Sequence, residues 1–492
     1  MRDVLLRGGR VIDPGTGTDR VADVLVREGL IHSVDVALPV PAGALVLDVR
    51  GLVVGPGFID LHSHVNSVRG HRLQAMDGVT TALELEAGAT PVDLAYRVTA
   101  REGRPLNYGF SASWSMARAQ VLLGTEPTMA LESTLDLFGQ QAWQRDSSPA
   151  ELTAWLDVLD RELADGALGI GVLLGYAPRT DPAEFLAVAR IAAKAGAPTY
   201  THAREIVEAD PTTPFDGAEE LVRAAGETGA AMHHCHVNST SRRHVDRVLD
   251  LLASAQAEGS QVTVEAYPYG AGSTGIGAFF LDPDRLSAWG LRPQSIVLVA
   301  TGERIADADR LREVRATDPA ATCILEFLDE RDPADRAILA RSLAFPDSIV
   351  ASDAMPVQLP ADASDPLAWP LPPGTGTHPR TSGTFAKAIR LMVRETGTWT
   401  WLEAFRRCAY LPSRVVAGIA PDAEGKGHLG IGADADIVVL DPDRITDNAT
   451  FTAPTRTSTG VTHLLVGGEF VVRDGELRTD AFPGRPLRGQ PG

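Results

Sequence analysis

Two histidines, His62 and His64, are the residues whose type and spacing first suggest chemistry in this 492-residue chain. They lie in the segment GFIDLHSHVN, residues 57–66, whose apolar residues predict a buried β-strand. Residues two apart on a strand share a face, so both imidazoles point to the same side. Together they could bind one divalent metal ion. Histidines also pair by chance or in a core, so this motif alone does not decide.

A second strand-like segment, GVTTALELEAG at residues 78–88, ends with Glu84 and Glu86 on one face. Buried carboxylates are costly unless they are paired or bound to a metal ion. We expect one of the two to be a metal ligand, and we favour Glu86 because it is nearer the strand end. A salt bridge to an arginine is the alternative interpretation of either.

More histidines follow in YTHARE, which contains His202, and in MHHCHVNS, which contains His233, His234 and His236. By strand alternation, His234 and His236 share one face, and His233 and Cys235 share the other. We expect His202 and His236, which lie at strand ends, to be metal ligands. His233 and His234 are interpreted as packing or supporting groups, and Cys235 as a small buried hydrophobe.

Asp353 follows an apolar run in SIVASDAMP, so it too is expected at a strand end. An aspartate there can be a weak metal ligand and can take a proton from water. The alternative is an N-cap of the next segment. Tyr267 and Tyr269, in EAYPYG, are candidates to donate a hydrogen bond to the oxygen of a substrate amide as charge develops. Simple ring packing is their alternative.

The elements that must position these residues are eight apolar runs that alternate with helical stretches. Because each run ends in polar or titratable residues, the chain is typical of a (β/α)8 TIM-like barrel, in which active sites lie at the C-terminal strand ends. A stretch from about 275 to 345 looks like an insertion, and the Pro-rich residues 359–379 look like a loop over the barrel mouth. The eight runs are residues 57–64, 78–88, 106–114, 167–176, 197–205, 230–238, 261–270 and 347–356.

The two ends of the chain carry short β-rich runs that neither end could close into a sheet alone. We therefore predict an α/β chain with a small β-sandwich formed by the N- and C-terminal segments. The expected domains are 1–54 and 423–492 for the two parts of the sandwich, and 55–422 for the barrel. Two separate flaps or hairpins on the barrel are the alternatives.

Composition limits the function classes. With 45 Lys and Arg against 64 Asp and Glu, the net charge of −19 disfavours nucleic acid and anionic membranes as partners. Three cysteines without metal-site spacing fit a reducing compartment. No apolar run has the length of a membrane span, and no signal peptide is evident. We expect a cytoplasmic protein with a small-molecule substrate; whether it forms a homo-oligomer stays open.

Taken in order, these motifs resemble the amidohydrolase superfamily in its D-aminoacylase-like branch, the N-acyl-D-amino-acid deacylases. The further segments HPRTSGTFAK and GADADIVVLDP also fit, and the ALELE-type second strand is most similar to D-glutamate deacylases. The resemblance implies Zn²⁺ as cofactor, with His62 and His64 at one metal position and His202 and His236 at the other. It also implies that one residue of the second strand reaches both metal positions. This residue is a cysteine in typical D-aminoacylases and a glutamate here, so the identity of the metal and the number of ions, one or two, stay open.

The resemblance implies metal-dependent hydrolysis of an N-acyl-D-amino acid, with N-acyl-D-glutamate as one candidate. It places a carboxylate-binding arginine in the HPRTSGTFAK segment, where Arg380 stands; Arg204, two residues after His202, is the other candidate. Hydantoinases and dihydroorotases use a carboxylated lysine from strand four, but residues 167–176 contain no lysine. Isoaspartyl dipeptide or cyclic-amide hydrolysis stays an alternative, and a non-catalytic barrel is disfavoured because the expected ligands are present.

Overall fold

The computed structural model describes residues 2–129, 131–213 and 215–490. The chain divides into two compact units. Unit 1 runs from the N-terminus to Leu83 and includes Val98–Gly109 and Ile349–Leu487. Unit 2 comprises Glu84–Arg97, Phe110–Ser348 and the chain from Arg488 onward. Each unit is described by itself below.

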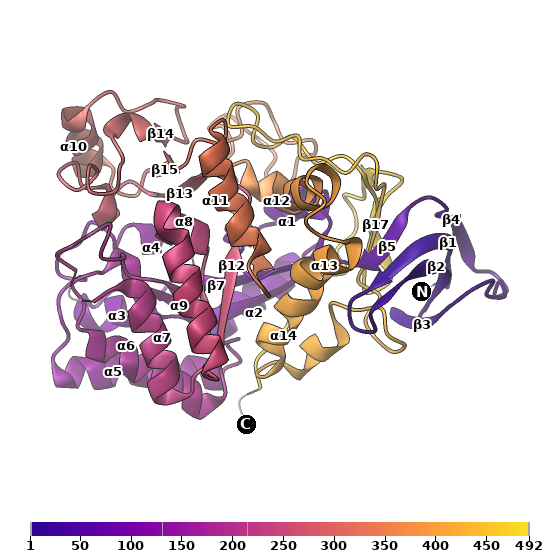
Figure 1. Ribbon diagram of the computed structural model, residues 1–492, viewed down its shortest axis with the longest axis horizontal. Coiled ribbons are helices and arrows are strands. Elements are labelled where there is room, and N and C mark those ends of the chain that lie inside the picture. The colour runs from indigo at the N-terminus through magenta and orange to yellow at the C-terminus, as the bar shows by residue number, and fades with distance from the viewer. Residues whose placement is uncertain (1, 130, 214, 491–492) are drawn as a thin grey trace. The chain divides into compact units, whose positions relative to one another are not determined.

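Both chain ends build a nine-stranded mixed sheet in unit 1. The central strand β5 pairs in parallel with β1 and antiparallel with β17, so the N-terminal and C-terminal strands are continuous through it (Figure 1). Apolar residues from both ends share one buried core, for example Val24 and Leu465. The predicted β domain of the two ends is therefore confirmed, in the form of a mixed sheet. Its strands are β1 Val4–Asp13, β2 Thr18–Arg27, β3 Leu30–Asp35, β4 Leu45–Asp48, β5 Val53–Pro56, β17 Ile437–Leu440, β18 Val461–Val466, β19 Glu469–Arg473 and β20 Glu476–Leu477.

The predicted eight barrel strands are all present, and they follow one another in a parallel eight-stranded sheet in the order β6 to β12 and then β16. Within unit 1 the first and last of them meet, because Ser63 and Ala354 form a parallel bridge just beyond β6 and β16. The sheet is thus a nearly closed, TIM-like barrel. Its strands are β6 Phe58–Asp60, β7 Val79–Ala89, β8 Asn107–Ser113, β9 Ile170–Leu173, β10 Thr199–His202, β11 Met232–His234, β12 Val262–Ala266 and β16 Ile349–Val350.

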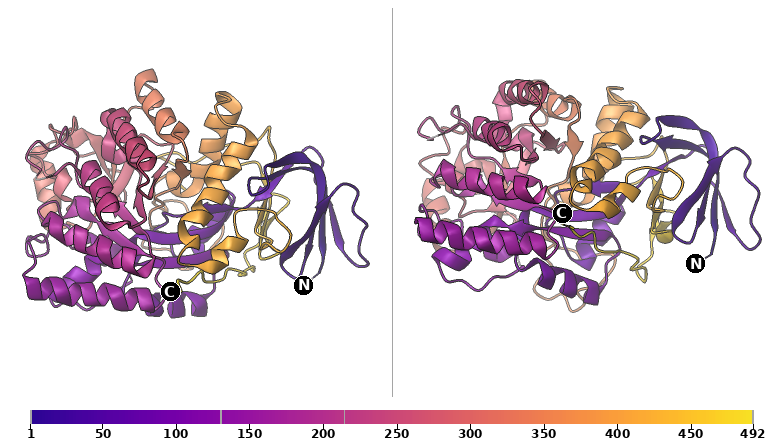
Figure 2. Two further views of the ribbon diagram at one scale, coloured as in Figure 1. Left: turned by 60° about the horizontal axis from the view of Figure 1, so that its bottom comes forward. Right: turned by 90° about the horizontal axis from the view of Figure 1, so that it is seen from below.

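The helices between the strands begin and end at residues that favour those ends. Asp181 and Asp216 cap α6 and α7 with their carboxylates, and Gly196 and Gly229 end these helices in the left-handed conformation. In unit 2, α5, α6, α7 and α9 pack successively side by side (Figure 2). The helices are α1 Val68–Ala75, α2 Val92–Glu102, α3 Trp114–Leu122, α4 Leu131–Leu135, α5 Pro149–Ala164, α6 Pro182–Ala195, α7 Gly217–Thr228, α8 Val237–Ser241, α9 Val245–Ala257, α10 Ala308–Thr317, α11 Pro333–Ala344, α12 Arg380–Ile389, α13 Trp401–Phe405 and α14 Leu411–Ala417.

The segment predicted as an insertion after strand seven carries a small sheet of its own in unit 2. Its strands β13 Ala271–Gly275, β14 Ile296–Leu298 and β15 Thr322–Glu326 are ordered β13-β15-β14. Helix α11 lies within the predicted insertion, but it packs against α8 and α9 and takes the place of the helix that follows strand seven, so the insertion ends before it. The domain limits drawn from the sequence stay a prediction. Among the described residues, no helix is both long and apolar enough to cross a membrane.

Candidate functional site

A buried cluster in unit 2 joins Glu86, His202 and His236. Glu86 belongs to β7, His202 is the last residue of β10, and His236 follows β11. Oε1 of Glu86 lies 3.1 Å from Nδ1 of His202 and 2.8 Å from Nε2 of His236. One ligand atom from each residue lies within 4.8 Å of the others. Two imidazoles and a carboxylate that converge in this way form a suitable divalent-metal site.

The second carboxylate of β7, Glu84, is also buried, but Glu86 is the one that these two histidines contact. The choice of Glu86 over Glu84 as the metal ligand stays a prediction.

Glu265, in β12, supports His236 and was not anticipated from the sequence. Its Oε1 accepts the backbone N–H of His236 at 3.2 Å, and its Oε2 lies 2.9 Å from Nε2 of His233. The oxygen of Ser239 lies 2.9 Å from Nδ1 of His236, on the ring edge away from Glu86. Such outer partners fix the orientation of a ligating imidazole. The His236 backbone is left-handed, with φ of 32°, so alternation along β11 does not extend to this residue.

His234 is a core residue. Its side chain is buried, and Nδ1 lies 3.0 Å from the carbonyl oxygen of Cys235. Burial lowers the pKa of His234 to about 4, so the ring is neutral at pH 7. Cys235 is likewise buried. These positions fit the packing roles expected for both residues.

A second buried cluster, in unit 1, contains His62, His64 and Asp353. The two Nε2 atoms lie 3.1 Å apart, and Oδ1 of Asp353 lies 3.5 Å from that of His62 and 3.6 Å from that of His64. Nη2 of Arg380 lies 2.9 Å from the same Oδ1. In the described chain the next helix after Asp353 is α12, which begins at Arg380, so the N-cap interpretation of Asp353 has no helix to cap.

Asp60 holds this second cluster together. Its Oδ1 accepts the backbone N–H groups of His62 and Ser352, at 3.2 Å and 2.9 Å, and its Oδ2 accepts from the Ser352 hydroxyl and from Gln74. Burial raises the pKa of Asp60 to about 6, although these hydrogen bonds oppose the rise. One carboxyl thus ties the residue beside Asp353 to His62, across the seam where the barrel closes.

Comparison with known proteins shows which proteins this chain is similar to. A model of the amidohydrolase family, Amidohydro_3, matches residues 241–472. A D-aminoacylase of Alcaligenes xylosoxydans xylosoxydans is 29% identical to this chain; the similarity covers 99% of this chain and 97% of the relative. An N-acyl-D-glutamate deacylase of the same organism is 28% identical, and the similarity covers 100% of this chain and 96% of the relative. A crystal structure of N-acyl-D-glutamate deacylase from Bordetella bronchiseptica, complexed with zinc and a phosphonate mimic of the tetrahedral intermediate, matches with a TM-score of 0.77 at 25% identity, covering 99% of both chains.

These similarities indicate an amidohydrolase of the D-aminoacylase type. The full-length similarity is to the D-aminoacylase branch, which the order of the sequence motifs also indicated.

In this amidohydrolase the two arginine candidates for substrate binding differ sharply. Arg204 is fully buried, and its guanidinium donates to both carboxylate oxygens of Glu220, at 2.9 and 3.1 Å, and to the carbonyls of Pro178 and Thr180. These bonds engage the guanidinium of Arg204 within the protein, where it joins β10 to the first turn of α7. Arg204 is therefore a poor candidate for binding the substrate carboxylate. Arg380 stays the candidate for binding the substrate carboxylate, and its guanidinium also contacts Asp353.

Tyr267 and Tyr269 are both buried at the end of β12. The side chain of Asn238 holds their backbone, accepting from the N–H of Tyr267 at 3.3 Å and donating to the carbonyl of Tyr269 at 3.4 Å. The ring of Tyr267 lies edge-on to that of His236, with centroids 6.2 Å apart. Tyr267 therefore lies beside the histidine cluster, and its role as a donor stays a prediction.

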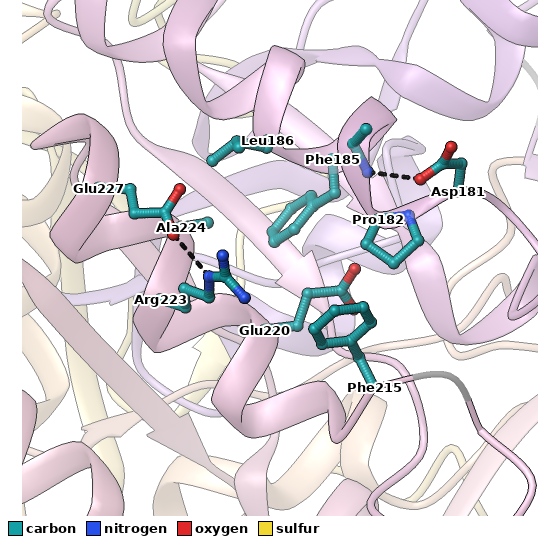
Figure 3. Close-up of a pocket in the computed structure, with 10 residues that line it drawn as sticks. Asp181, Pro182, Phe185, Leu186, Phe215, Glu220, Arg223, Ala224 and Glu227 are labelled. Carbon is teal, nitrogen blue, oxygen red and sulfur yellow. Dashed lines mark hydrogen bonds and ion pairs between the residues drawn. The ribbon is translucent and has the colours of Figure 1, made fainter.

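A surface pocket of about 280 Å³ in unit 2 lies apart from these residues (Figure 3). Its wall is mainly apolar, with Phe185 and Phe215 among the lining residues, and Arg223 and Glu227 form an ion pair there. Glu220 also lines it and forms the ion pair with Arg204. None of the predicted site residues lines this pocket.

Proposed function

We propose that this amidohydrolase hydrolyses the amide bond of N-acyl-D-amino acids, releasing a carboxylate and the free amino acid. The observation that carries the proposal is the buried convergence of Glu86, His202 and His236 in a chain similar to D-aminoacylases along its whole length. N-acyl-D-glutamate is a substrate candidate because two of the similar proteins are named for that activity.

The donor sets fit a divalent metal ion such as Zn²⁺. In unit 2 a buried carboxylate oxygen faces two imidazole nitrogens within 3.1 Å, and in unit 1 two imidazole nitrogens and a carboxylate oxygen lie within 3.6 Å of one another. A buried carboxylate is costly without a charge partner, so a cation among these donors is favourable. When bound, such an ion lowers the pKa of water and polarises a carbonyl. Whether one or two ions are held is part of the proposal to be tested.

The protein's own groups then move the protons. Asp353 accepts a proton from the attacking water and returns it to the amine nitrogen as the amide bond breaks. Tyr267 or Tyr269 donates a hydrogen bond to the amide oxygen while negative charge develops on it. Arg380 binds the α-carboxylate of the substrate; a guanidinium has five N–H donors, so its bond to Asp353 leaves this role compatible.

A substrate screen on metal-analysed protein tests this proposal. N-acetyl, N-formyl and N-succinyl derivatives of D- and L-amino acids are assayed before and after chelation, then with zinc restored. We expect hydrolysis of D-amino acid derivatives that is lost with the metal and regained with zinc. Activity that survives complete metal removal, or a preference for L-amino acids, would contradict it. Cyclic amides and isoaspartyl dipeptides in the same screen test the alternative substrates.

A further inference from the structure

His233 is a buried histidine of β11 that we do not assign as a metal ligand. Its ring is hydrogen-bonded on both edges: Nδ1 lies 2.8 Å from the hydroxyl oxygen of Thr263, and Nε2 lies 2.9 Å from Oε2 of Glu265. His233 and Glu265 are each 1% exposed. A buried imidazole with two such partners has a fixed orientation, so it can in turn hold the groups that it contacts.

The pairing of β11 with β12 brings these three residues together. His233 lies opposite Thr263 in the register of the two parallel strands. Glu265 follows Thr263 by two residues, so strand alternation places both side chains on the same face. The next residue along β11, His234, points to the other face. The register of the sheet therefore aims His233, and not its neighbour, at the Glu265 carboxylate.

Glu265 uses its other oxygen to hold the backbone of His236. Oε1 accepts the N–H of His236 at 3.2 Å. That backbone is left-handed, with φ of 32° and ψ of 60°, a conformation that residues other than glycine seldom adopt. It persists where surrounding contacts hold it, and the bond from Glu265 is such a contact. Because the two oxygens of Glu265 have different partners, a rotation that breaks the bond to His233 also disturbs the bond to His236.

The backbone conformation of His236 decides where its imidazole points. Nε2 lies 2.8 Å from Oε1 of Glu86, where we propose that the metal ion binds. On the opposite edge of the ring, Nδ1 lies 2.9 Å from the oxygen of Ser239. Ser239 thus acts on the ring, whereas Glu265 acts on the main chain that carries it. A change at His233 can reach the metal position in two steps, through Glu265 and then through the backbone of His236.

We propose that His233 is a positioning residue of the metal site. By holding Glu265, it keeps His236 in the left-handed conformation from which Nε2 reaches Glu86. The inference rests on the proposed function, because it concerns the residues that would hold the ion. In this role His233 contacts neither the ion nor the substrate, so its effect is on metal affinity and, only through that, on turnover.

Zinc affinity, measured by competition with a chelator and without any substrate, tests the proposal. His233→Leu removes both hydrogen bonds of the ring and keeps an apolar side chain in its place. We expect the dissociation constant of the tightly held zinc to rise about ten- to a hundredfold, the usual effect of losing a residue that orients a metal ligand. The visible absorption of the cobalt-loaded protein, which depends on ligand geometry, should change with it. Unchanged affinity and absorption would overturn the proposal.

His234→Leu is the matched control, because it makes the same substitution one residue further along the strand, at a side chain that is also 1% exposed. This variant can lose stability, but the folded protein should bind zinc as the wild type does. If it weakens zinc binding as much as His233→Leu, the loss comes from damage to the core and the proposal is wrong.

Two amide variants test the contact with Glu265 even if His233→Leu does not fold. The longer amide of His233→Gln can still donate to Glu265, so most of the zinc affinity should be retained. The shorter amide of His233→Asn can reach Thr263 but not Glu265, and it should bind zinc as weakly as the leucine variant. Equal zinc affinities of the two amide variants would contradict the proposal.

A double-mutant cycle shows whether His233 acts through Glu265. Glu265→Leu should weaken zinc binding at least as much as His233→Leu, and combining the two should have little further effect. Additive losses would mean that His233 reaches the site by another route, which overturns the inference. A wild type that binds no zinc would contradict the proposed function as well, whereas normal zinc binding and hydrolysis in His233→Leu would overturn this inference alone.

Discussion

Glu86 and Asp353 are both buried carboxylates at the ends of barrel strands, but their partners differ in charge. Oε1 of Glu86 faces two imidazole nitrogens. Oδ1 of Asp353 lies 2.9 Å from Nη2 of Arg380, and it is farther from Nε2 of His62 and of His64, at 3.5 and 3.6 Å. The Arg380 guanidinium gives Asp353 a countercharge, whereas the imidazole nitrogens around Glu86 are donors that could share a metal cation with it. We therefore expect the tighter metal site at Glu86 and the proton transfer at Asp353.

The sharpest way to break this comparison is to remove the charge of Glu86. Glu86→Gln should lose the tightly held ion and at least about a thousandfold in kcat/KM, because the ligand and the charge that offsets the metal disappear together. Metal content by mass spectrometry and turnover are measured on the same sample. Glu84→Gln is the matched control, and a reversal of the two phenotypes would make Glu84 the ligand.

Asp353→Asn should give the next largest loss of activity, but without loss of the metal ion. We expect turnover to fall by about 10²–10⁴, the usual contribution of a general acid or base, while the tightly held ion is retained. The acid limb of the pH–rate profile should disappear with it, since Asp353 must be ionised to accept a proton. Asp362→Asn, in the exposed Pro-rich loop, is a neutral control. Near-normal turnover of Asp353→Asn would remove this residue from the mechanism.

Arg380→Ala separates its two assigned contacts, with the substrate and with Asp353. We expect kcat/KM for N-acyl-D-amino acids to fall roughly ten- to a hundredfold, because the bidentate carboxylate contact is lost. An analogue in which the α-carboxylate is an uncharged amide should be affected much less. Equal losses on both would mean that Arg380 acts through Asp353 and does not bind the substrate carboxylate.

The smallest expected effect is on stability and concerns Asp60, which supports the unit 1 cluster. Its folded-state pKa, about 6, lies above the ordinary 3.8, so the folded protein binds this proton more tightly than the unfolded chain. Stability should therefore be lost as pH rises from about 4 to about 6 in the metal-free protein, by up to about 3 kcal/mol. Asp60→Asn should flatten this dependence in urea unfolding between pH 4 and 7. An unchanged slope would show that another group titrates there.

Sequence patterns predicted the strands well because they depend on local features. The eight apolar runs all became barrel strands, and the histidines at or near their ends are buried. The pattern was weaker where the chain leaves regular structure. Alternation along β11 could not describe His236, and Asp353 has φ of 50°, also in the left-handed region. Neither conformation leaves a signal in residue type, because both are held by distant contacts.

The boundaries of the insertion were also only partly predictable. Helix α11 buries one face that mixes polar residues, such as Asp335 and Ser342, with apolar ones, and only its packing on α8 and α9 shows that it belongs to the barrel. Composition and hydrophobic periodicity cannot distinguish these alternatives, since both bury one face of the helix.

The sequence by itself determined the barrel, the β domain of the two ends and the residue types at the strand ends, because strand period and the parallel sheet place such residues without further information. Only the tertiary structure decided how each charge is used. Arg204 and Arg380 look alike in sequence, yet Glu220 binds the first and Asp353 the second. Glu265 reaches His236 across 29 positions, and Trp289 covers Arg242 across 47. Such pairings depend on which elements the fold brings together, and no local pattern encodes them.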